Sequence, residues 1–379
     1  MRDSNKIYDV CFISISDIKS DARTLNIARV LSKNGKSVSI IAFGDDKDME
    51  SFQSEGIDFF RVDEIDTGKA YKRWLHFIKS AKRHNNIYAK LYWASDFFSL
   101  FTANKFARKF RAKIYYDSRE IYSRVGSLSN NAFKQYIQTK LELRWVKNVD
   151  RVIVSGELDA DYLKKHFKID VPYHVIMNLP PYREKVNADL LRENFSILKD
   201  KKIILYQGML MMGRGIIPVV SALQFLDNVV FCLLGTGNYK DQIFNHAKEL
   251  GVDDRVMFCG HVDYDELHNW TSSADIANCL IEPISFCNEL ALPNKMFEYC
   301  MAGIPSIISD LPAMKKIIDE YPFGKIIPRD SSPKEIAEAI KEVLKDENHK
   351  KYKENCEEAA KIFSYENQEK IILEIFDEL

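Results

Sequence analysis

The chain has 379 residues, too many for one ordinary domain, so we expect two. Its composition, 46% hydrophobic and 29% charged, excludes intrinsic disorder. A membrane-spanning helix needs about 18 apolar residues in a row, and no uninterrupted apolar run approaches this length. The formal net charge of −1 hides an asymmetry. Residues 1–180 hold 31 Lys and Arg against 22 Asp and Glu, and residues 69–144 alone hold 17 against 4. A difference of this size bears on the partners of the protein.

Cysteine use and the first residues both indicate an intracellular protein. The seven cysteines form no CxxC pair and mostly fall in apolar runs. That pattern is typical of reduced core thiols, and it indicates neither a disulfide framework nor a zinc site. The start MRDSNKIYDV lacks the pattern of a signal peptide. We therefore expect a cytoplasmic location.

The first half of the chain alternates apolar, β-branched runs with helical patterns. This rhythm is typical of parallel β-α-β units with helices on both faces of the sheet. Strands are expected at 7–15, 37–43, 87–92, 113–117, 151–155 and 173–178, and helices at 21–35, 69–83, 96–110 and 131–147.

A connection with two prolines, LPPYREK (179–185), precedes a second series of the same kind. We therefore predict an α/β fold of two doubly wound domains, with ligands at a cleft where the carboxyl ends of both sets of strands meet. The expected boundaries are 1–182 for the first domain, 183–360 for the second, and 361–379 for a helix that packs back at the junction. Strands of the second domain are expected at 202–208, 229–235, 256–260, 276–281, 305–310 and 324–328.

The segment ELALPNKMFEYCMAG (289–303) carries the most chemistry. Pro293 and Asn294 open an apolar helix in which Lys295 and Glu298, three residues apart, share one face near the helix N-terminus. Free backbone N–H groups there favour anions, so Lys295 can pair with a diphosphate while Glu298 accepts hydrogen bonds from sugar hydroxyls. The alternative is a structural helix with an internal Lys–Glu ion pair.

Two glycine-containing loops follow strands of the second half. Gly208, Gly213 and Gly215 leave the backbone open to approach phosphate oxygens, and Arg214 can then contact a diphosphate through two hydrogen bonds. The alternative is an ordinary strand–helix loop with a surface arginine. The second loop, 235–238 with Gly237 and Asn238, is weak by itself because Gly-x-Gly loops follow many strands.

Three segments in this order resemble the donor-binding domain of the retaining glycosyltransferases of family four. These enzymes have the GT-B architecture of two facing Rossmann-like domains. The segments are YQGMLMMGRGI (206–216), CLLGTGNY (232–239) and LPNKMFEYCMAGIPSIISD (292–310). Weaker matches in the first half are SDARTLNIARVLSKNGKSVSII (20–41), YYDSREIY (115–122), DRVIVSGELDADYL (150–163) and VIMNLPP (175–181).

The resemblance implies a role for each matching residue. Glu298 would hold the ribose hydroxyls of a nucleotide, and Lys295 and Arg214 would neutralise the phosphate as the glycosyl–phosphate bond breaks. It implies retention by a front-face mechanism in which the departing phosphate helps to take the acceptor proton. No metal or other cofactor is implied, and the co-substrate is a nucleoside diphosphate sugar, with a UDP-sugar as the first candidate. Other implied donor contacts are Gly208, Gly213, Gly215, Gly237, Asn238, Pro293 and Asn294.

Three positions depart from the family pattern. Many members carry two glutamates separated by seven residues, but here the position eight before Glu298 is Leu290, and the nearest acid is Glu289. Glu289 is kept as a candidate catalytic residue on the sugar side. Met209 stands where the family often has arginine. Arg119 stands where it commonly has a histidine, and either adds positive charge to the cleft or pairs with Asp117 or Glu120.

The first domain offers fewer candidates. Ser16 and Asp17, after the first strand, are expected to face the acceptor or sugar together with Arg119 and Glu120, although Ser and Asp at a strand end are more often turn and cap residues. The acids at 45, 46 and 48 are expected to end a solvated loop and not to hold a metal.

The cations of residues 69–144 predict attraction to an anionic membrane surface, which suits a lipid-linked acceptor. A merely soluble basic surface is the alternative. No RNA- or DNA-binding motif accompanies the charge, so nucleic acid is not an expected partner. The sequence thus predicts a peripheral membrane glycosyltransferase of surface polysaccharide or glycoconjugate biosynthesis. Alternatives are a sugar-nucleotide epimerase or hydrolase of the same fold, or a non-catalytic partner subunit.

Overall fold

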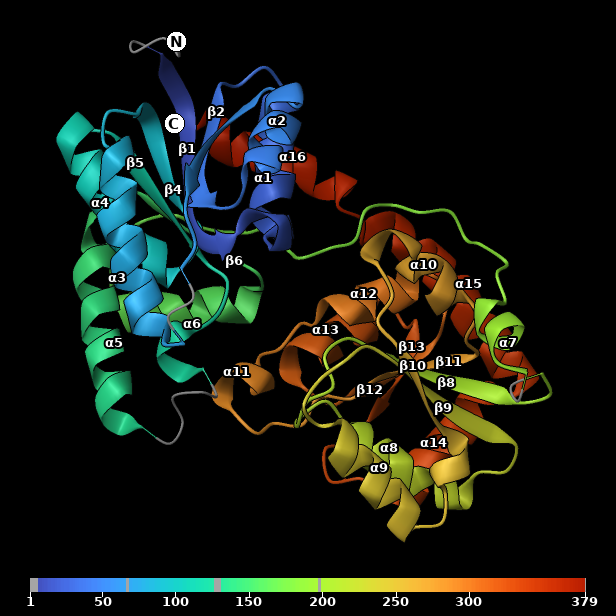
Figure 1. Cartoon of the computed structure of the whole chain (residues 1–379). Coiled ribbons are helices and arrows are strands. Elements are labelled where there is room, and N and C mark those ends of the chain that lie inside the picture. The colour runs from blue at the N-terminus through green and yellow to red at the C-terminus, as the bar shows by residue number, and fades with distance from the viewer. Residues whose placement is uncertain (1–5, 66–67, 126–130, 197–198, 379) are drawn as a thin grey trace. The chain divides into compact units, whose positions relative to one another are not determined.

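The computed structural model describes residues 6–65, 68–125, 131–196 and 199–378. The chain forms two compact units, residues 1–177 with 368–379, and residues 178–367 (Figure 1). Each unit is a parallel sheet with helices, so the predicted α/β fold of two doubly wound domains is confirmed. The sequence placed the boundaries at 182/183 and 360/361, and the compact units change at 177/178 and 367/368.

The first unit contains a seven-stranded parallel sheet. Its strand β1, which lies between β2 and β4, continues to Asp17, two residues beyond the predicted end, with an irregular register after Ile13. Ser16 and Asp17, which were expected to follow the strand, therefore belong to its end. In spatial order the strands are β3 (Ile57–Val62), β2 (Val38–Phe43), β1 (Ile7–Asp17), β4 (Tyr88–Ala94), β5 (Lys113–Ser118), β6 (Arg151–Val154) and β7 (Tyr173–Val175).

Three elements of the first unit, α2, β3 and α6, were not predicted. Asp45 caps α2 through a reciprocal capping box with Asp48, whose side chain is buried. The expectation that these acids end a solvated loop is wrong, because the carboxylates satisfy backbone N–H groups at a helix start. The helices are α1 (Ala22–Lys33), α2 (Asp46–Ser54), α3 (Ala70–Ala81), α4 (Phe97–Phe110), α5 (Ala132–Trp145), α6 (Glu157–Phe167) and α16 (Glu366–Asp377).

The last helix completes the first unit. Ile372, Ile375 and Phe376 of α16 are buried. The Lys36 ammonium pairs with Asp377 at 2.7 Å, and Arg151 pairs with Glu378 at 2.6 Å. The helical pattern predicted for 361–379 is interrupted between Ile362 and Glu366, where the preceding helix ends and α16 begins.

The second unit contains a six-stranded parallel sheet. Its strand order is β10 (Val256–Gly260), β9 (Val229–Leu234), β8 (Lys202–Gln207), β11 (Ile276–Cys279), β12 (Ser306–Ser309) and β13 (Gly324–Ile327). All six were predicted, since each is an apolar run followed by a turn residue. The helices are α7 (Leu190–Asn194), α8 (Ile216–Ala222), α9 (Lys240–Glu249), α10 (Tyr264–Ser272), α11 (Phe286–Glu289), α12 (Asn294–Met301), α13 (Pro312–Glu320), α14 (Pro333–Leu344) and α15 (Asp346–Ile362).

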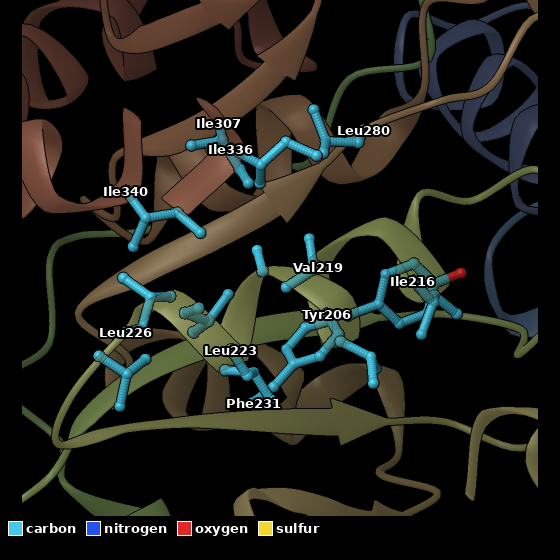
Figure 2. Packing of buried hydrophobic residues seen from close by; sticks show 14 of the residues in the cluster. Tyr206, Ile216, Val219, Leu223, Leu226, Phe231, Leu280, Ile307, Ile336 and Ile340 are labelled. Carbon is cyan, nitrogen blue, oxygen red and sulfur yellow. The ribbon is translucent and has the colours of Figure 1, made fainter. Parts of the chain in front are cut away.

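One hydrophobic cluster fixes the sheet of the second unit against α8 and α14. In Figure 2, Val219 and Leu223 of the segment after β8 meet Ile336 and Ile340 of α14 and Phe231 of β9. Tyr206, the residue before the last of β8, belongs to the same cluster and is 1% exposed. The carboxyl end of β8 is therefore anchored by close packing.

The described residues include all seven cysteines, and none of them forms a disulfide, as the sequence predicted. Across the described residues, the structure contains no helix that is both long and apolar enough to cross a membrane.

Candidate functional site

The residues singled out in the second unit gather at the carboxyl ends of its strands. Pro293 is the N-cap of α12, which runs from Asn294 to Met301. Lys295 lies in the first turn of that helix and Glu298 one turn later, so both project from one face, as predicted.

The Lys295 ammonium lies on the ring of Tyr206, with Nζ 4.0 Å from the ring centroid. The core holds that ring, and its hydroxyl donates to the Met209 carbonyl at 2.7 Å, so the position of the cation is fixed by packing. Burial, with a contribution from the nearby Arg214 charge, lowers the pKa of Lys295 to about 8.

Neither Arg214 nor Lys295 takes part in an ion pair among the residues that the structure describes. The internal Lys295–Glu298 ion pair, the structural alternative, is not formed within this set. Among the described residues, two neighbouring cations at the carboxyl edge of a parallel sheet thus form no direct ion pair with a carboxylate. This arrangement suits a ligand with a phosphate or diphosphate group.

Glu298 is held by a chain of hydrogen bonds. The Gln207 amide Nε2 donates to Glu298 Oε2 at 2.6 Å, and Gln207 Oε1 accepts from the Thr271 hydroxyl at 2.7 Å. The backbone N–H of Gln207 donates to the Tyr299 hydroxyl at 2.9 Å. The pKa of the Glu298 carboxyl is raised above its ordinary value, because the effect of burial outweighs the lowering effects of the Gln207 hydrogen bond and of Lys295. The carboxyl is thus oriented, with acceptor capacity left for vicinal hydroxyls.

A pocket adjoins Glu298 within the second unit. It is lined by Pro180, Arg183, Gln207, Tyr264, Leu267, His268, Thr271, Glu298 and Met301. The Arg183 guanidinium lies 5.9 Å from the Tyr264 ring centroid and donates to the Asp265 carbonyl at 2.9 Å. None of the residues from α10 in this pocket was selected from sequence, because an amphipathic helix gives no local sign of a ligand.

The glycines of the two loops serve loop-to-loop packing. A Cβ on Gly235 would lie 1.9 Å from the Gly208 carbonyl oxygen, and one on Gly237 would lie 2.1 Å from the Leu210 carbonyl oxygen. The Gly208 N–H donates to the Leu234 carbonyl at 2.9 Å, and the Leu210 N–H donates to Thr236 at 2.9 Å. Close backbone contact therefore explains glycine at 235 and 237.

Two backbone N–H groups proposed for phosphate contact are already engaged. Gly208 donates within the loop contact, and the Gly215 N–H donates to the Glu282 carboxylate at 3.0 Å. The interpretation that these two groups are open to phosphate is therefore wrong. Glu282, just after β11, escaped the sequence analysis, although a carboxylate at a strand end was the available signal. Gly213 has a φ of 82°, and Asn238 is exposed in the turn before α9.

Glu289 lies at the end of α11 and pairs with Arg329 at 3.5 Å. Both side chains are partly exposed, which makes this a weak surface pair. The position Leu290, which the family pattern would fill with glutamate, is the C-cap of α11.

In the first unit, Arg119 forms structural ion pairs. Its Nη1 lies 2.7 Å from Asp21, its Nη2 donates to the Thr24 hydroxyl at 2.6 Å, and its Nε lies 3.6 Å from Asp117. Burial opposes the charge of Arg119, but the two aspartates outweigh it and raise its pKa. Of the two readings of Arg119, the geometry favours the structural ion pair.

The other first-unit candidates lie at the same sheet edge. Asp17 accepts from the Lys19 N–H at 3.1 Å and caps a short 3-10 turn, and the Ser16 N–H donates to the Ser14 hydroxyl at 3.3 Å. Glu120 follows Arg119 and is exposed. The cap and turn roles weighed for Ser16 and Asp17 are therefore present in the structure.

Among the described residues, no group of three or more His, Cys, Asp or Glu side chains is arranged to hold a metal ion.

The second unit matches a known protein family. The family described as "Glycosyl transferases group 1" matches residues 187–363. A protein of Methanocaldococcus jannaschii described as an uncharacterized glycosyltransferase is 27% identical over 186 residues, covering 48% of this chain and 44% of that protein. The chain thus aligns with less than half the length of the curated relatives that it matches.

Solved structures resemble the whole chain. Sucrose-phosphate synthase of Thermosynechococcus elongatus superposes with a TM-score of 0.80 at 17% identity, covering 97% of this chain and 98% of that one. HepE of Anabaena in complex with UDP-glucose superposes with a TM-score of 0.75 at 15% identity, covering 98% and 99%. The chain therefore has the fold of GT-B glycosyltransferases, and its residues 187–363 are similar to the glycosyl transferases group 1 family.

Proposed function

We propose that the protein transfers a sugar from a nucleoside diphosphate sugar, with retention and without a metal, to a glycan or lipid-linked acceptor. The observation that carries this proposal is the pair of neighbouring cations Arg214 and Lys295, which lack ion-pair partners among the described residues, with Lys295 one helical turn from Glu298 on α12. A UDP-sugar is the first candidate, because HepE, which shares the fold, has been crystallised with UDP-glucose.

In the proposed reaction, the cations act on the leaving group. As the glycosyl–phosphate bond breaks, negative charge grows on the diphosphate, and Arg214 and Lys295 stabilise it, Lys295 from a position that its contact with Tyr206 fixes before the reaction. Two protein cations thereby take over a task that a divalent metal performs in other transferases. The departing phosphate oxygen accepts the proton of the acceptor hydroxyl on the same face of the sugar, which gives retention.

Glu298 anchors the donor in this scheme. Its carboxylate accepts hydrogen bonds from the two ribose hydroxyls, while Gln207 and Thr271 hold it in place. The acceptor belongs to surface polysaccharide or glycoconjugate synthesis and reaches the enzyme at an anionic membrane surface, where the cations of residues 69–144 attract lipid headgroups.

A thermal-shift panel of UDP, GDP, ADP and CDP and their common sugar conjugates tests the proposal. A ligand at 100 times its Kd stabilises the native protein by about 2.7 kcal/mol, so the base that fits should raise the melting temperature clearly. Loss of hydrogen bonds to a charged group costs about 1.5–3 kcal/mol, so Glu298→Ala should weaken binding by about 10- to 100-fold.

Glu342→Ala is the matched control. This glutamate pairs with Lys325 at 2.7 Å on α14 and should leave nucleotide affinity unchanged. No shift with any nucleotide would sink the proposal and favour a non-catalytic partner. Consumption of the nucleotide sugar without an acceptor would instead favour the epimerase or hydrolase alternative.

A further inference from the structure

The helix α5 exposes large apolar side chains. Phe133 is 73% exposed, Tyr136 60% and Ile137 42%. Their spacing of three and four residues places all three on one stripe of the helix. A surface helix normally turns such a stripe inward, so here the usual arrangement is inverted.

Polar contacts hold this end of α5 on its other side. The Gln135 side chain donates to the Ser123 carbonyl and the Gln138 side chain donates to the Tyr122 carbonyl, both at 2.7 Å. The exposed stripe therefore does not attach the helix to its own unit. Clustered apolar groups that do not serve the core mark a surface that contacts something else.

The neighbouring helix α3 repeats the pattern. Tyr71 and Leu75, one turn apart, are 57% and 55% exposed. Figure 1 shows α3, α4 and α5 side by side, and the rings of Trp74 and Trp145 join α3 to α5 with centroids 6.0 Å apart. The two helices thus pack against each other, and each of them also exposes apolar residues.

The same three helices carry an almost purely cationic surface. Of the four acids within residues 69–144, Asp96, Asp117 and Glu142 are buried and do not offset the surface charge. Exposed cations occur on all three helices, and none of those named next is in an ion pair within the described part of the chain. Examples are Lys72, Lys79, Lys105, Arg108, Lys140 and Arg144.

We propose that this face, defined by α3, α4 and α5, docks on an anionic bilayer with Phe133, Tyr136 and Ile137 entering the headgroup–acyl boundary. Aromatic rings suit that boundary, and the surrounding lysines and arginines meet the lipid phosphates. The Lys140 ammonium lies 5.4 Å from the Tyr136 ring centroid, so charge and apolar surface adjoin directly. Membrane docking extends the proposed function. It depends on that function only for the reason why the protein would dock, which is access to a lipid-linked acceptor.

Charge complementarity selects the bilayer over a second copy of the chain. Another copy would bring the same unpaired cations to the contact and repel this face. Attraction by charge alone also differs from insertion in a measurable way, since added salt screens the former and leaves apolar burial in place.

The test is flotation of the full chain with vesicles of phosphatidylglycerol and phosphatidylcholine in equal amounts, and with phosphatidylcholine alone, at low and high salt. The triple variant Phe133→Ser, Tyr136→Ser and Ile137→Ser should bind the anionic vesicles at least about tenfold more weakly, with the larger loss at high salt. The matched control is Phe225→Ser with Phe244→Ser, two exposed phenylalanines of the second unit, which should bind like the parent.

Three results would overturn the inference: no binding of the parent chain to anionic vesicles, equal binding by the triple variant, or a parent dimer in sedimentation velocity that the triple variant loses. The thermal shift with UDP separates this inference from the proposed function, because the triple variant should keep it. A variant that loses vesicle binding and keeps the UDP shift supports the membrane face whatever reaction the protein performs.

Discussion

The cations at the carboxyl edges of the two sheets differ in their ion pairing. In the first unit, Arg23 pairs with Asp117 at 2.9 Å and Arg119 pairs with Asp21 at 2.7 Å, all nearly buried. In the second unit, Arg214 and Lys295 have no such partner among the described residues. The same place in the same kind of fold thus holds a satisfied network in one unit and an incomplete one in the other. An incomplete network is the one that a charged ligand can complete.

The largest expected difference is in stability. Arg23→Met leaves the fully buried Asp117 without its closest cation and should lower the free energy of unfolding by about 3–5 kcal/mol. Arg214→Met breaks no ion pair and should change it by no more than about 0.5 kcal/mol. Urea unfolding of the full chain measures both, and equal losses would erase the proposed distinction between the two edges.

A smaller effect should appear in the pH dependence of nucleotide binding. Lys295 has a pKa of about 8 in the unliganded protein, so it is charged below and increasingly neutral above that pH. A diphosphate prefers the charged form, and affinity should fall by up to about tenfold between about pH 7 and about pH 9.5. Titration calorimetry checks this, and Lys295→Arg, which stays charged, should give a flat profile.

The stability of the unliganded protein should move in the opposite direction over the same range. The native lysine loses its proton near pH 8 while the unfolded one keeps it, so the unfolded state binds more protons and native stability rises with pH. A parallel fall of affinity and stability would point to general loosening of the fold instead of titration of Lys295.

The smallest effect concerns Glu289. Its exposed pair with Arg329 predicts a stability change of no more than about 0.5 kcal/mol for Glu289→Gln. If Glu289 serves the donor sugar, the variant should keep its affinity for UDP and bind the matching UDP-sugar several-fold more weakly. Arg329→Met is the control for the ion pair. Equal changes with UDP and UDP-sugar would assign Glu289 to structure alone.

Local patterns in the sequence predict most of the fold. The strands of the second unit are continuous apolar runs, and Pro293 and an apolar stripe predict α12. Short-range sequence rules therefore suffice to predict these elements. The elements α2, β3 and α6 were missed, and α2 escaped because its capping acids Asp45 and Asp48 look like a polar loop. Reciprocal capping is visible in the sequence only once the helix itself is suspected.

The candidate site was predicted in part. Lys295, Glu298 and Arg214 were selected from local spacing and resemblance. Gln207 and Tyr206 were not, because their partners Glu298 and Lys295 lie about 90 residues away in the chain and no pattern in one sequence encodes such pairs. The glycine loops were misjudged for a related reason. In the amino-acid sequence, a glycine that allows close contact between the Gly208 and Gly235 backbones cannot be told from a glycine that leaves a loop open for a ligand.

The return of α16 to the first unit has a consequence for biosynthesis. The chain leaves this unit at residue 177 and supplies its remaining part at 368–379, so the second unit is an uninterrupted insertion. During synthesis on the ribosome, the first unit cannot complete its fold until Ile372, Ile375 and Phe376 have been made, while the second unit can fold earlier. The half made first is therefore the half finished last, and until then it exposes an apolar surface that a chaperone can recognise.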